Sequence, residues 1–246
     1  SGQTFSEFDA LIHRPHGIVL VTGPTGSGKT TTLYGALLRL RSTVNNIMTV
    51  EDPIEYQVSG ITQVPVRAEI NMTFASALKA ILRQSPDVVM VGEIRDSETA
   101  DIASKAAQTG HLVLSTLHTN DAPSTLARLS QMGIAGFNLA SSVSLVCAQR
   151  LLRRLCMSCK QPMPDNSGYR AIGCHLCLDG YKGRIAIHQV MPITHSLQLL
   201  MLQQASAIEL AQQAQREGVR SLRDSGMLKV AAGETTLEEV VAATHE

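Results

Sequence analysis

The sequence has no tryptophan, and its eight aromatic residues are four tyrosines and four phenylalanines among 246 residues. Single-stranded nucleic acid is bound by stacking its bases on aromatic rings, so this scarcity disfavours such a platform. The formal net charge is zero, because 21 Lys and Arg balance 21 Asp and Glu. We therefore expect no global basic surface that would collect nucleic acid or anionic lipid. Five cysteines are also too few for a small disulfide scaffold.

The sequence shows neither a secretory signal nor a typical membrane span. It begins at Ser1, without an initiator Met or a charged segment before an apolar one, which suggests a fragment of a longer protein. The longest uncharged stretch, 129–149, has 21 residues and would span a bilayer by length. Seven of its residues are Ser, Gln or Asn and two are Gly, so we interpret it as a buried helix of a globular domain.

Short apolar runs alternate with helical patterns in the first half of the chain. Strands are expected at 18–21, 47–50, 88–91 and 112–114, and helices at 29–41, 74–82 and 97–107. Continuous apolar runs are typical of parallel strands covered on both faces, so the pattern predicts an α/β domain with a mainly parallel sheet.

Beyond Pro123 the pattern changes. It predicts helices at 123–132 and 138–149, a cysteine-rich insert, a short strand at 185–190 and helical segments to the end. We accordingly divide the chain into a core of residues 1–150, an insert of residues 151–183 and a mostly helical C-terminal subdomain of residues 184–246.

A glycine-rich segment lies between the first expected strand and the first expected helix. It fits G-x-x-x-x-G-K-[ST], the phosphate loop of P-loop nucleotidases, in the context that this motif requires. Its glycines allow successive N–H groups to point at phosphate oxygens, and the helix N-terminus adds partial positive charge. Lys29 is expected to neutralise the β and γ phosphates, and the Thr30 hydroxyl to bind Mg²⁺. The candidate nucleotide-binding residues are Gly23, Pro24, Thr25, Gly26, Ser27, Gly28, Lys29, Thr30 and Thr31.

The third expected strand is followed by Gly92 and Glu93. A glutamate at this place can orient water toward a γ phosphate as a general base, so Glu93 is the predicted catalytic residue. Gly92 stands where many such proteins have a magnesium-binding aspartate. Asp87 cannot substitute for that aspartate, because five residues of strand put it at the opposite end of the sheet. Another acid must therefore reach the metal.

The ends of two other expected strands supply candidates. Glu51, Asp52 and Glu55 follow the second strand, and the C-terminal ends of parallel strands share the edge where ligands bind. A solvated loop is the alternative for these acids. His118 follows the fourth strand and is placed to donate to a γ phosphate, whereas His111 at the start of that strand is more ambiguous, since a lone histidine is usually structural.

Four segments together resemble the signature boxes of the secretion ATPase superfamily, the motors of type II secretion and type IV pili. Thr22–Leu33, Val50–Glu55, Asp87–Asp96 and Thr109–Thr119 resemble its phosphate loop, aspartate box, atypical second Walker motif and histidine box. Likeness at Gly180–Arg184 and Gly233–Glu239 extends the resemblance over nearly the whole chain. The resemblance implies a RecA-like P-loop NTPase whose Mg-dependent ATP hydrolysis powers assembly of a type IV pilus or a type II pseudopilus.

The resemblance also implies roles and partners. Glu55 would help to bind magnesium through water, Glu93 would be the catalytic base, and His118 would contact the γ phosphate. The protein would form a homo-oligomeric, hexameric ring in the cytoplasm, peripheral to the bacterial inner membrane and its platform proteins. Gln189 stands where the resemblance leads us to expect an acid, after the segment Gly180–Arg184, which we call the Gly-Arg box. This departure weakens no catalytic assignment.

Family members carry an N-terminal domain whose arginines complete the active site of a neighbouring subunit. Because only 22 residues precede the phosphate loop, we expect that domain to be absent here. The chain is then expected to bind ATP but to hydrolyse it slowly. Arg150, Arg153 and Arg154 are interpreted either as a solvated helix face or as a patch that contacts a subunit or partner.

Four cysteines have the spacing C-x2-C-x14-C-x2-C, close to that of four-thiolate zinc sites. They are Cys156, Cys159, Cys174 and Cys177. Zinc would fold an insert that is too small for its own core. A disulfide pair and free thiols are alternatives, and His175 is a weaker candidate ligand. By resemblance this element is typical of assembly motors and absent from retraction motors, which favours assembly. Cys147, in the expected apolar helix, is interpreted as an inert core residue.

Two other functional classes stay open on the residues alone. A nucleic-acid-translocating ATPase of conjugative or helicase type shares the core chemistry, although zero net charge and scarce aromatics disfavour it. A nucleotide-gated scaffold without turnover is hard to reconcile with the presence of both Glu93 and His118. The sequence does not separate a pilus motor from a type II secretion motor.

Overall fold

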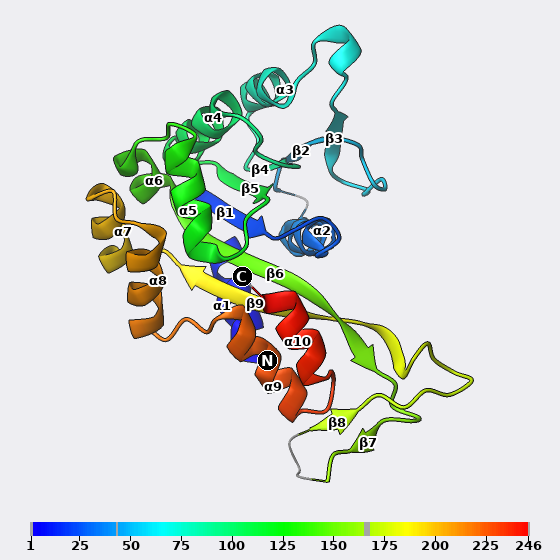
Figure 1. Ribbon diagram of the computed structural model, residues 1–246. Helices are drawn as coiled ribbons and strands as arrows, with labels where there is room; N and C mark the ends of the chain where they lie inside the picture. Colours follow the sequence, from blue (N-terminus) through cyan, green and yellow to red (C-terminus); the bar gives the residue numbers. More distant parts are fainter. Residues whose placement is uncertain (1, 43, 165–167, 246) are drawn as a thin grey trace.

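The computed structural model describes residues 2–42, 44–164 and 168–245. Within these ranges the main element is a seven-stranded sheet in the order β3-β2-β4-β5-β1-β6-β9 (Figure 1). Its neighbouring strands are parallel, except that β6 and β9 are antiparallel. The strands of this sheet are β1 (Gly17–Thr22), β2 (Ile47–Glu51), β3 (Thr62–Pro65), β4 (Val88–Val91), β5 (Leu112–Leu117), β6 (Val143–Leu155) and β9 (Tyr181–Pro192). The sheet confirms the predicted α/β class with mainly parallel strands.

Helices cover both faces of this sheet. The helices are α1 (Gly2–Ile12), α2 (Lys29–Leu40), α3 (Phe74–Ile81), α4 (Ser97–Gln108), α5 (Ala122–Gln131), α6 (Gly136–Ser142), α7 (His195–Leu202), α8 (Ala207–Arg216), α9 (Leu222–Ala231) and α10 (Leu237–Thr244). Two short 3-10 turns span Ala68–Ile70 and Leu82–Gln84. A small ribbon of β7 (Gln161–Pro162) and β8 (Tyr169–Arg170) lies in the cysteine insert, beyond the far end of β6 (Figure 1).

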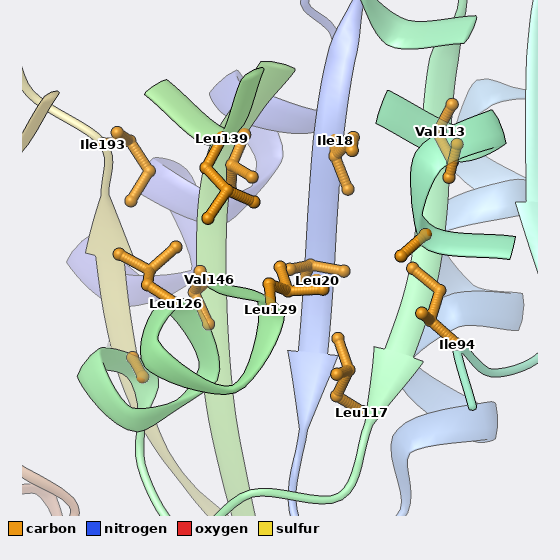
Figure 2. Packing of buried hydrophobic residues seen from close by; sticks show 14 of the residues in the cluster. Ile18, Leu20, Ile94, Val113, Leu117, Leu126, Leu129, Leu139, Val146 and Ile193 are labelled. Carbon is orange, nitrogen blue, oxygen red and sulfur yellow. The ribbon is translucent and has the colours of Figure 1, made fainter. Parts of the chain in front are cut away.

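The core consists of two apolar layers, one on each side of the sheet. Alternate residues of β1 enter different layers: Ile18 and Leu20 pack with α3 to α6, whereas Val19 and Val21 pack with α1 and α2. Figure 2 shows the first layer, where Leu126 and Leu129 of α5 and Leu139 of α6 lie over the sheet. This double coverage explains why the strand sequences are continuous apolar runs rather than alternating ones.

The predicted helix at 138–149 is wrong. α6 ends at Ser142, and the following residues form β6, which pairs with β1 on one side and β9 on the other. Periodicity alone does not distinguish a buried strand from a buried helix within a short apolar run, and here two strand partners decide between them. Cys147 is therefore a buried strand residue rather than a helical one.

Several other boundaries differ from those expected. The strand expected at 185–190 is the middle of β9, and β3 was not predicted. β6 runs on through residue 150 and pairs with β9, so residues on both sides of the proposed boundary at 150 lie in one sheet. None of the helices in the described ranges is both long enough and apolar enough to cross a bilayer.

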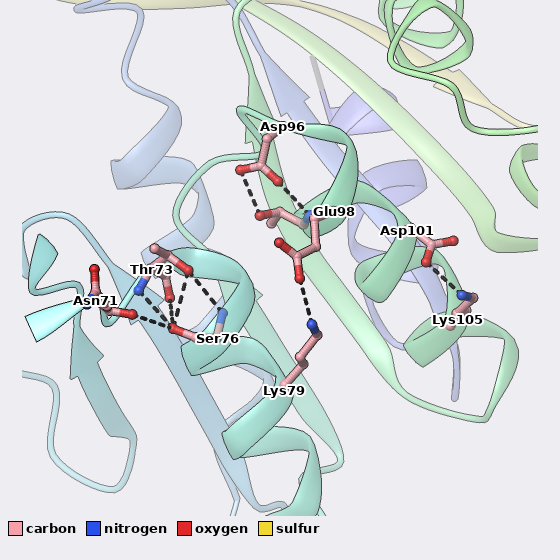
Figure 3. A network of polar contacts seen from close by, with 9 residues as sticks. Asn71, Thr73, Ser76, Lys79, Asp96, Glu98, Asp101 and Lys105 are labelled. Atoms are coloured by element: carbon pink, nitrogen blue, oxygen red, sulfur yellow. Dashed lines mark hydrogen bonds and ion pairs between the residues drawn. The ribbon is translucent and has the colours of Figure 1, made fainter.

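Polar contacts fix the N-termini of α3 and α4, and with them the loop that follows β4 (Figure 3). Asp96 caps α4 by accepting from the backbone N–H of Thr99 at 2.7 Å, and Thr73 caps α3 in a reciprocal box with Ser76. The Lys79 ammonium joins the two helices by donating to Glu98 at 2.6 Å. The Asp96 cap thus holds the helical end of the loop between β4 and α4, which carries Glu93.

The three arginines near the cysteine insert lie on β6, so the interpretation as a helix face is wrong. Arg150 donates to the backbone oxygens of Gln149 and Asn120 at 3.1 and 2.8 Å. Arg153 donates to Glu239 of α10 through its side chain, at 2.6 and 2.9 Å, and its guanidinium lies over the Tyr181 ring. Arg150 and Arg153 are therefore bound within the chain and do not form one free patch with Arg154.

Arg153→Ala is expected to lower the free energy of unfolding by about 1 kcal/mol, since the arginine is half exposed and its ion pair is screened by water. Burial acts to raise the pKa of Glu239, but the bonds from Arg153 outweigh it and the net pKa is lowered. The contribution is therefore present above the ordinary value of 4.5 and is lost as the pH falls through the folded-state pKa. Urea unfolding at pH 7 and pH 3 checks this, with Arg154→Ala as the control. An equal loss at both pH values would contradict it.

Candidate functional site

The C-terminal ends of β2, β4 and β5 and the loop after β1 surround an open cavity of about 590 Å³. Its walls include most of the residues singled out from the sequence. These are Thr25, Gly26, Gly28, Lys29, Thr30 and Thr31 of the glycine-rich loop, together with Glu55, Glu93 and His118. Segments far apart in the sequence therefore meet at one edge of the sheet, as expected for an open α/β fold.

Two glycines allow the loop after β1 to take its shape. Gly23 and Gly28 have φ angles of 152° and 85°, which L side chains rarely adopt. A Cβ on Gly23 would lie 2.5 Å from the backbone oxygen of Gln149, so the loop packs directly against β6. The motif's glycines are thus required by backbone geometry and by close packing.

The loop contains polar atoms that suit a bound phosphate. The Lys29 ammonium donates to the carbonyls of Gly23 and Pro24 at 2.8 and 3.0 Å. Burial lowers the pKa of Lys29, and the negative charge of Glu93 partly offsets this effect. The buried Ser27 hydroxyl has no hydrogen-bond partner in the part of the chain that the structure describes. A buried polar atom without a partner is costly, so an anion in the loop would fit these residues.

Glu93 lies at the centre of a charged group on the cavity wall. Its side chain is only 17% exposed, and its carboxylate is 3.4 Å from Nε2 of His118. Arg95 pairs with the same carboxylate and also reaches Asp52 at 3.5 Å. Glu93 and His118, two of the residues predicted to act on the nucleotide, are therefore direct neighbours. Arg95, to which the sequence analysis gave no role, binds the glutamate.

The structure gives a physical reason for the glycine that precedes Glu93. A Cβ on Gly92 would lie 3.3 Å from the Val50 backbone oxygen and 3.5 Å from the Phe74 ring. A side chain at this position, such as a metal-binding aspartate, would crowd the end of β2. Asp87 is at the other end of β4, where it accepts from the backbone N–H of Asn46 at 2.7 Å. As expected, Asp87 cannot take the place of the metal-binding aspartate that many such proteins have at the position of Gly92.

The three acids after β2 have different surroundings. Glu51 is 3% exposed and accepts hydrogen bonds from Tyr34, from Thr49 at 2.5 Å and from Gln63 at 3.0 Å. Burial raises the pKa of Tyr34, with the Glu51 bond adding to the effect. These bonds engage both carboxylate oxygens of Glu51 in a buried network.

The other two acids lie closer to solvent. Asp52 is paired with Arg95. Glu55 is exposed at the cavity wall, and among the described residues it takes part in no ion pair. Of the three acids, Glu55 is thus the one whose carboxylate is available to a metal.

His111 does not belong to this cavity. It lies just before β5, at the opposite end from His118, and its Nδ1 is 2.9 Å from the carbonyl oxygen of Ala106 near the end of α4. A carbonyl can only accept, so Nδ1 carries the proton in this contact. Its position indicates a structural role.

Sequence reasoning missed further residues around the loop. Gln149 and Arg184 come from β6 and β9, and Arg184 lines the cavity. Gln149 belongs to no local motif, and the sequence analysis placed it in a helix. It reaches the phosphate loop only because β6 pairs with β1. Arg184 is the last residue of the Gly-Arg box, Gly180–Arg184. Its place in that box was the one feature of the sequence that could have indicated a role for it.

The four paired cysteines form a cluster in which all sulfur atoms lie within 4.8 Å of one another. Neighbouring sulfurs are 3.6, 3.7 and 3.9 Å apart. A tetrahedral ion with metal–sulfur bonds of about 2.3 Å requires sulfur–sulfur edges of about 3.8 Å, whereas a disulfide requires about 2.05 Å. The donor set therefore fits a four-thiolate metal site, and among the described residues His175 is not part of the cluster.

Cys147 is separate from this cluster. It is 1% exposed on β6, and burial raises the pKa of its thiol to about 12. Since the thiolate is the reactive form, this thiol is inert near neutral pH. The interpretation of Cys147 as a core residue is confirmed, although on a strand.

Comparison with known proteins agrees with this site. The family described as "Type II/IV secretion system protein" matches residues 2–242. The chain belongs to this family. The resemblance found in the four boxes is thereby confirmed, together with the RecA-like fold expected from it.

Two curated relatives illustrate the family. This chain is 54% identical over 239 residues to the type II secretion system protein HxcR of Pseudomonas aeruginosa. The match covers 97% of this chain and 50% of that protein. It is 52% identical over 261 residues to the type IV pilus assembly ATPase PilB of Myxococcus xanthus, covering 98% and 46%. The chain thus spans about half the length of the curated relatives that it matches.

A solved structure of similar fold is the crystal structure of the pilus retraction motor PilT with bound ADP. The two share a TM-score of 0.79 and 31% identity, over 98% of this chain and 64% of that one. The match covers the α/β core and the helices that follow it.

Proposed function

We propose that this chain is the ATPase part of a motor that assembles a type IV pilus or a type II secretion pseudopilus. The observation that carries the proposal is the single cavity in which the glycine-rich loop, Glu55, Glu93 and His118 meet. Relatives named as type IV pilus assembly ATPases and type II secretion proteins support the same activity.

Nucleotide binding is assigned to the loop after β1. Its N–H groups and the N-terminus of α2 would bind the phosphates of ATP, and the Lys29 ammonium would exchange its two loop carbonyls for phosphate oxygens. The Thr30 hydroxyl and, through water, the exposed Glu55 carboxylate would hold Mg²⁺. When bound, the ion neutralises charge on the phosphates.

Hydrolysis is assigned to Glu93 and His118. The Glu93 carboxylate would orient water toward the γ phosphate and take its proton. Arg95 holds that carboxylate, and His118, 3.4 Å away, would donate to the γ phosphate. The half-exposed His118 side chain would thereby respond to the presence of the terminal phosphate.

The cysteine cluster and the names of the relatives support assembly rather than retraction. Cys156, Cys159, Cys174 and Cys177 would hold Zn²⁺ as thiolates, and the ion would fold the insert around β7 and β8. The active protein would be a homo-oligomeric ring, hexameric by family likeness, in the cytoplasm at the inner membrane. There it would act on platform proteins of a pilus or secretion system.

Lys29→Ala tests the proposed nucleotide site. The unmodified chain is expected to bind MgATP, and the variant to lose ~100-fold or more in affinity, because a buried ammonium that binds phosphate is removed. Isothermal titration measures both affinities, and Lys79→Ala, an exposed lysine on α3, serves as the control. Equal affinity of Lys29→Ala and the unmodified chain would refute the site.

A further inference from the structure

Gln149 places a buried polar side chain between the phosphate loop and the first turn of α2, although it belongs to β6. It is 2% exposed. Its amide nitrogen donates to the carbonyl of Ser27 at 2.7 Å, and its amide oxygen accepts from the hydroxyl of Thr32 at 2.7 Å. Because the Ser27 carbonyl can only accept, the amide nitrogen must face it, and the two bonds together fix the orientation of the carboxamide.

The bond to Ser27 fixes the peptide plane between Ser27 and Gly28. In a trans peptide the carbonyl and the following N–H point in opposite directions. The Ser27 carbonyl is directed at Gln149, so the N–H of Gly28 is directed away from Gln149. The N–H groups of such loops are the groups that bind phosphate oxygens. Gln149 thus sets the direction of one of these donors without facing the cavity itself.

The packing of the loop on Gln149 is tight at both ends of the glycine motif. A Cβ on Gly28 would lie 2.9 Å from the amide nitrogen of Gln149, and a Cβ on Gly23 would lie 2.5 Å from its backbone oxygen. The carboxamide also joins the loop to α2 through Thr32, whose own N–H donates to the Gly28 carbonyl at 3.1 Å. Loop, helix and strand therefore share one small hydrogen-bonded unit.

We propose that Gln149 is a positioning residue of the nucleotide site. Its carboxamide holds the Ser27–Gly28 peptide in the orientation that binds phosphate and ties that peptide to the start of α2. The inference rests on the proposed function, because it requires that the loop bind a nucleotide. Gln149 acts through Ser27 and makes no contact with the nucleotide itself.

Three variants of the 246-residue chain test this role. Gln149→Glu places an acceptor against the Ser27 carbonyl, Gln149→Met removes both bonds at similar volume and no charge, and Thr32→Val removes only the helix-side bond. We expect both Gln149 variants to weaken MgADP binding by ~10- to ~100-fold, because the buried Ser27 carbonyl loses the donor that orients its peptide. Thr32→Val keeps that donor, so we expect it to weaken MgADP binding less than either Gln149 variant. Isothermal titration with MgADP gives the affinities.

Thermal unfolding without nucleotide separates positioning from a purely structural role. If Gln149→Met lowers the Tm but binds MgADP as the unmodified chain does, the inference is overturned. If Gln149→Glu does not fold, Gln149→Met alone tests the role of Gln149. If the unmodified chain itself binds no MgADP, the proposed function fails as well, whereas normal binding by the unmodified chain and by both Gln149 variants overturns this inference alone.

Discussion

Glu93→Gln is expected to lower the rate of MgATP hydrolysis by ~10²- to ~10⁴-fold, the usual contribution of a general base. The glutamine keeps the shape of the side chain but cannot take a proton from water. The affinity for MgATP is expected to stay within about threefold, because Glu93 stabilises the transition state rather than the bound nucleotide. Steady-state phosphate release and isothermal titration on the same protein separate the two effects.

Glu98→Gln is the matched control for this substitution. Glu98 is an exposed glutamate on α4 whose carboxylate pairs with Lys79, and it is not among the residues that line the cavity. Its replacement is expected to leave hydrolysis unchanged. If Glu93→Gln hydrolysed ATP at the rate of Glu98→Gln, the assignment of the general base would be wrong, and a nucleotide-gated scaffold would become the better description.

Cys174→Ser is expected to abolish zinc binding and to unfold the insert. Structural zinc sites of this kind contribute ~10–16 kcal/mol of apparent binding free energy, which is folding free energy for a segment with little core. The unmodified chain is expected to contain one zinc per chain, and the variant much less than one. Elemental analysis measures the zinc, and hydrogen exchange across residues 156–164 and 168–180 is expected to show lost protection in the variant alone.

Cys147→Ala is the control for the cysteine experiment, since Cys147 lies in the core of the sheet, apart from the cluster. It is expected to keep its zinc while losing about 1 kcal/mol of stability from the small cavity that it leaves. Absence of zinc from the purified unmodified chain, or full zinc content in Cys174→Ser, would contradict the metal site. Free thiols would then be the better interpretation of the four cysteines.

The sequence predicted those parts of the site that depend on local motifs. The glycine-rich loop lies between a strand and a helix, as its motif requires, and Glu93 and His118 come together because the strands that precede them are parallel neighbours. The cysteine spacing likewise predicted the cluster. The division into a core, an insert and a C-terminal subdomain stays a prediction.

Contacts between distant segments were not predictable in this way. β6 was taken for a helix, because its apolar run has no periodicity that excludes one, and the error concealed Gln149 and the pairing of Arg153 with Glu239. The burial of Glu51 was missed for a related reason, since its donors Tyr34 and Gln63 come from α2 and β3, and β3 was not expected. Side chains held by tertiary pairing carry little signal in the sequence near them.

The most direct test of the account is the rate of MgATP hydrolysis per chain as a function of chain concentration, with Glu93→Gln as the blank. We predict a slow rate that depends on Glu93 and rises with concentration, because the proposed ring would form as chains associate and would place a neighbouring chain beside the site. A rate equal to that of the blank at every concentration would contradict the assignment of ATP hydrolysis to this cavity.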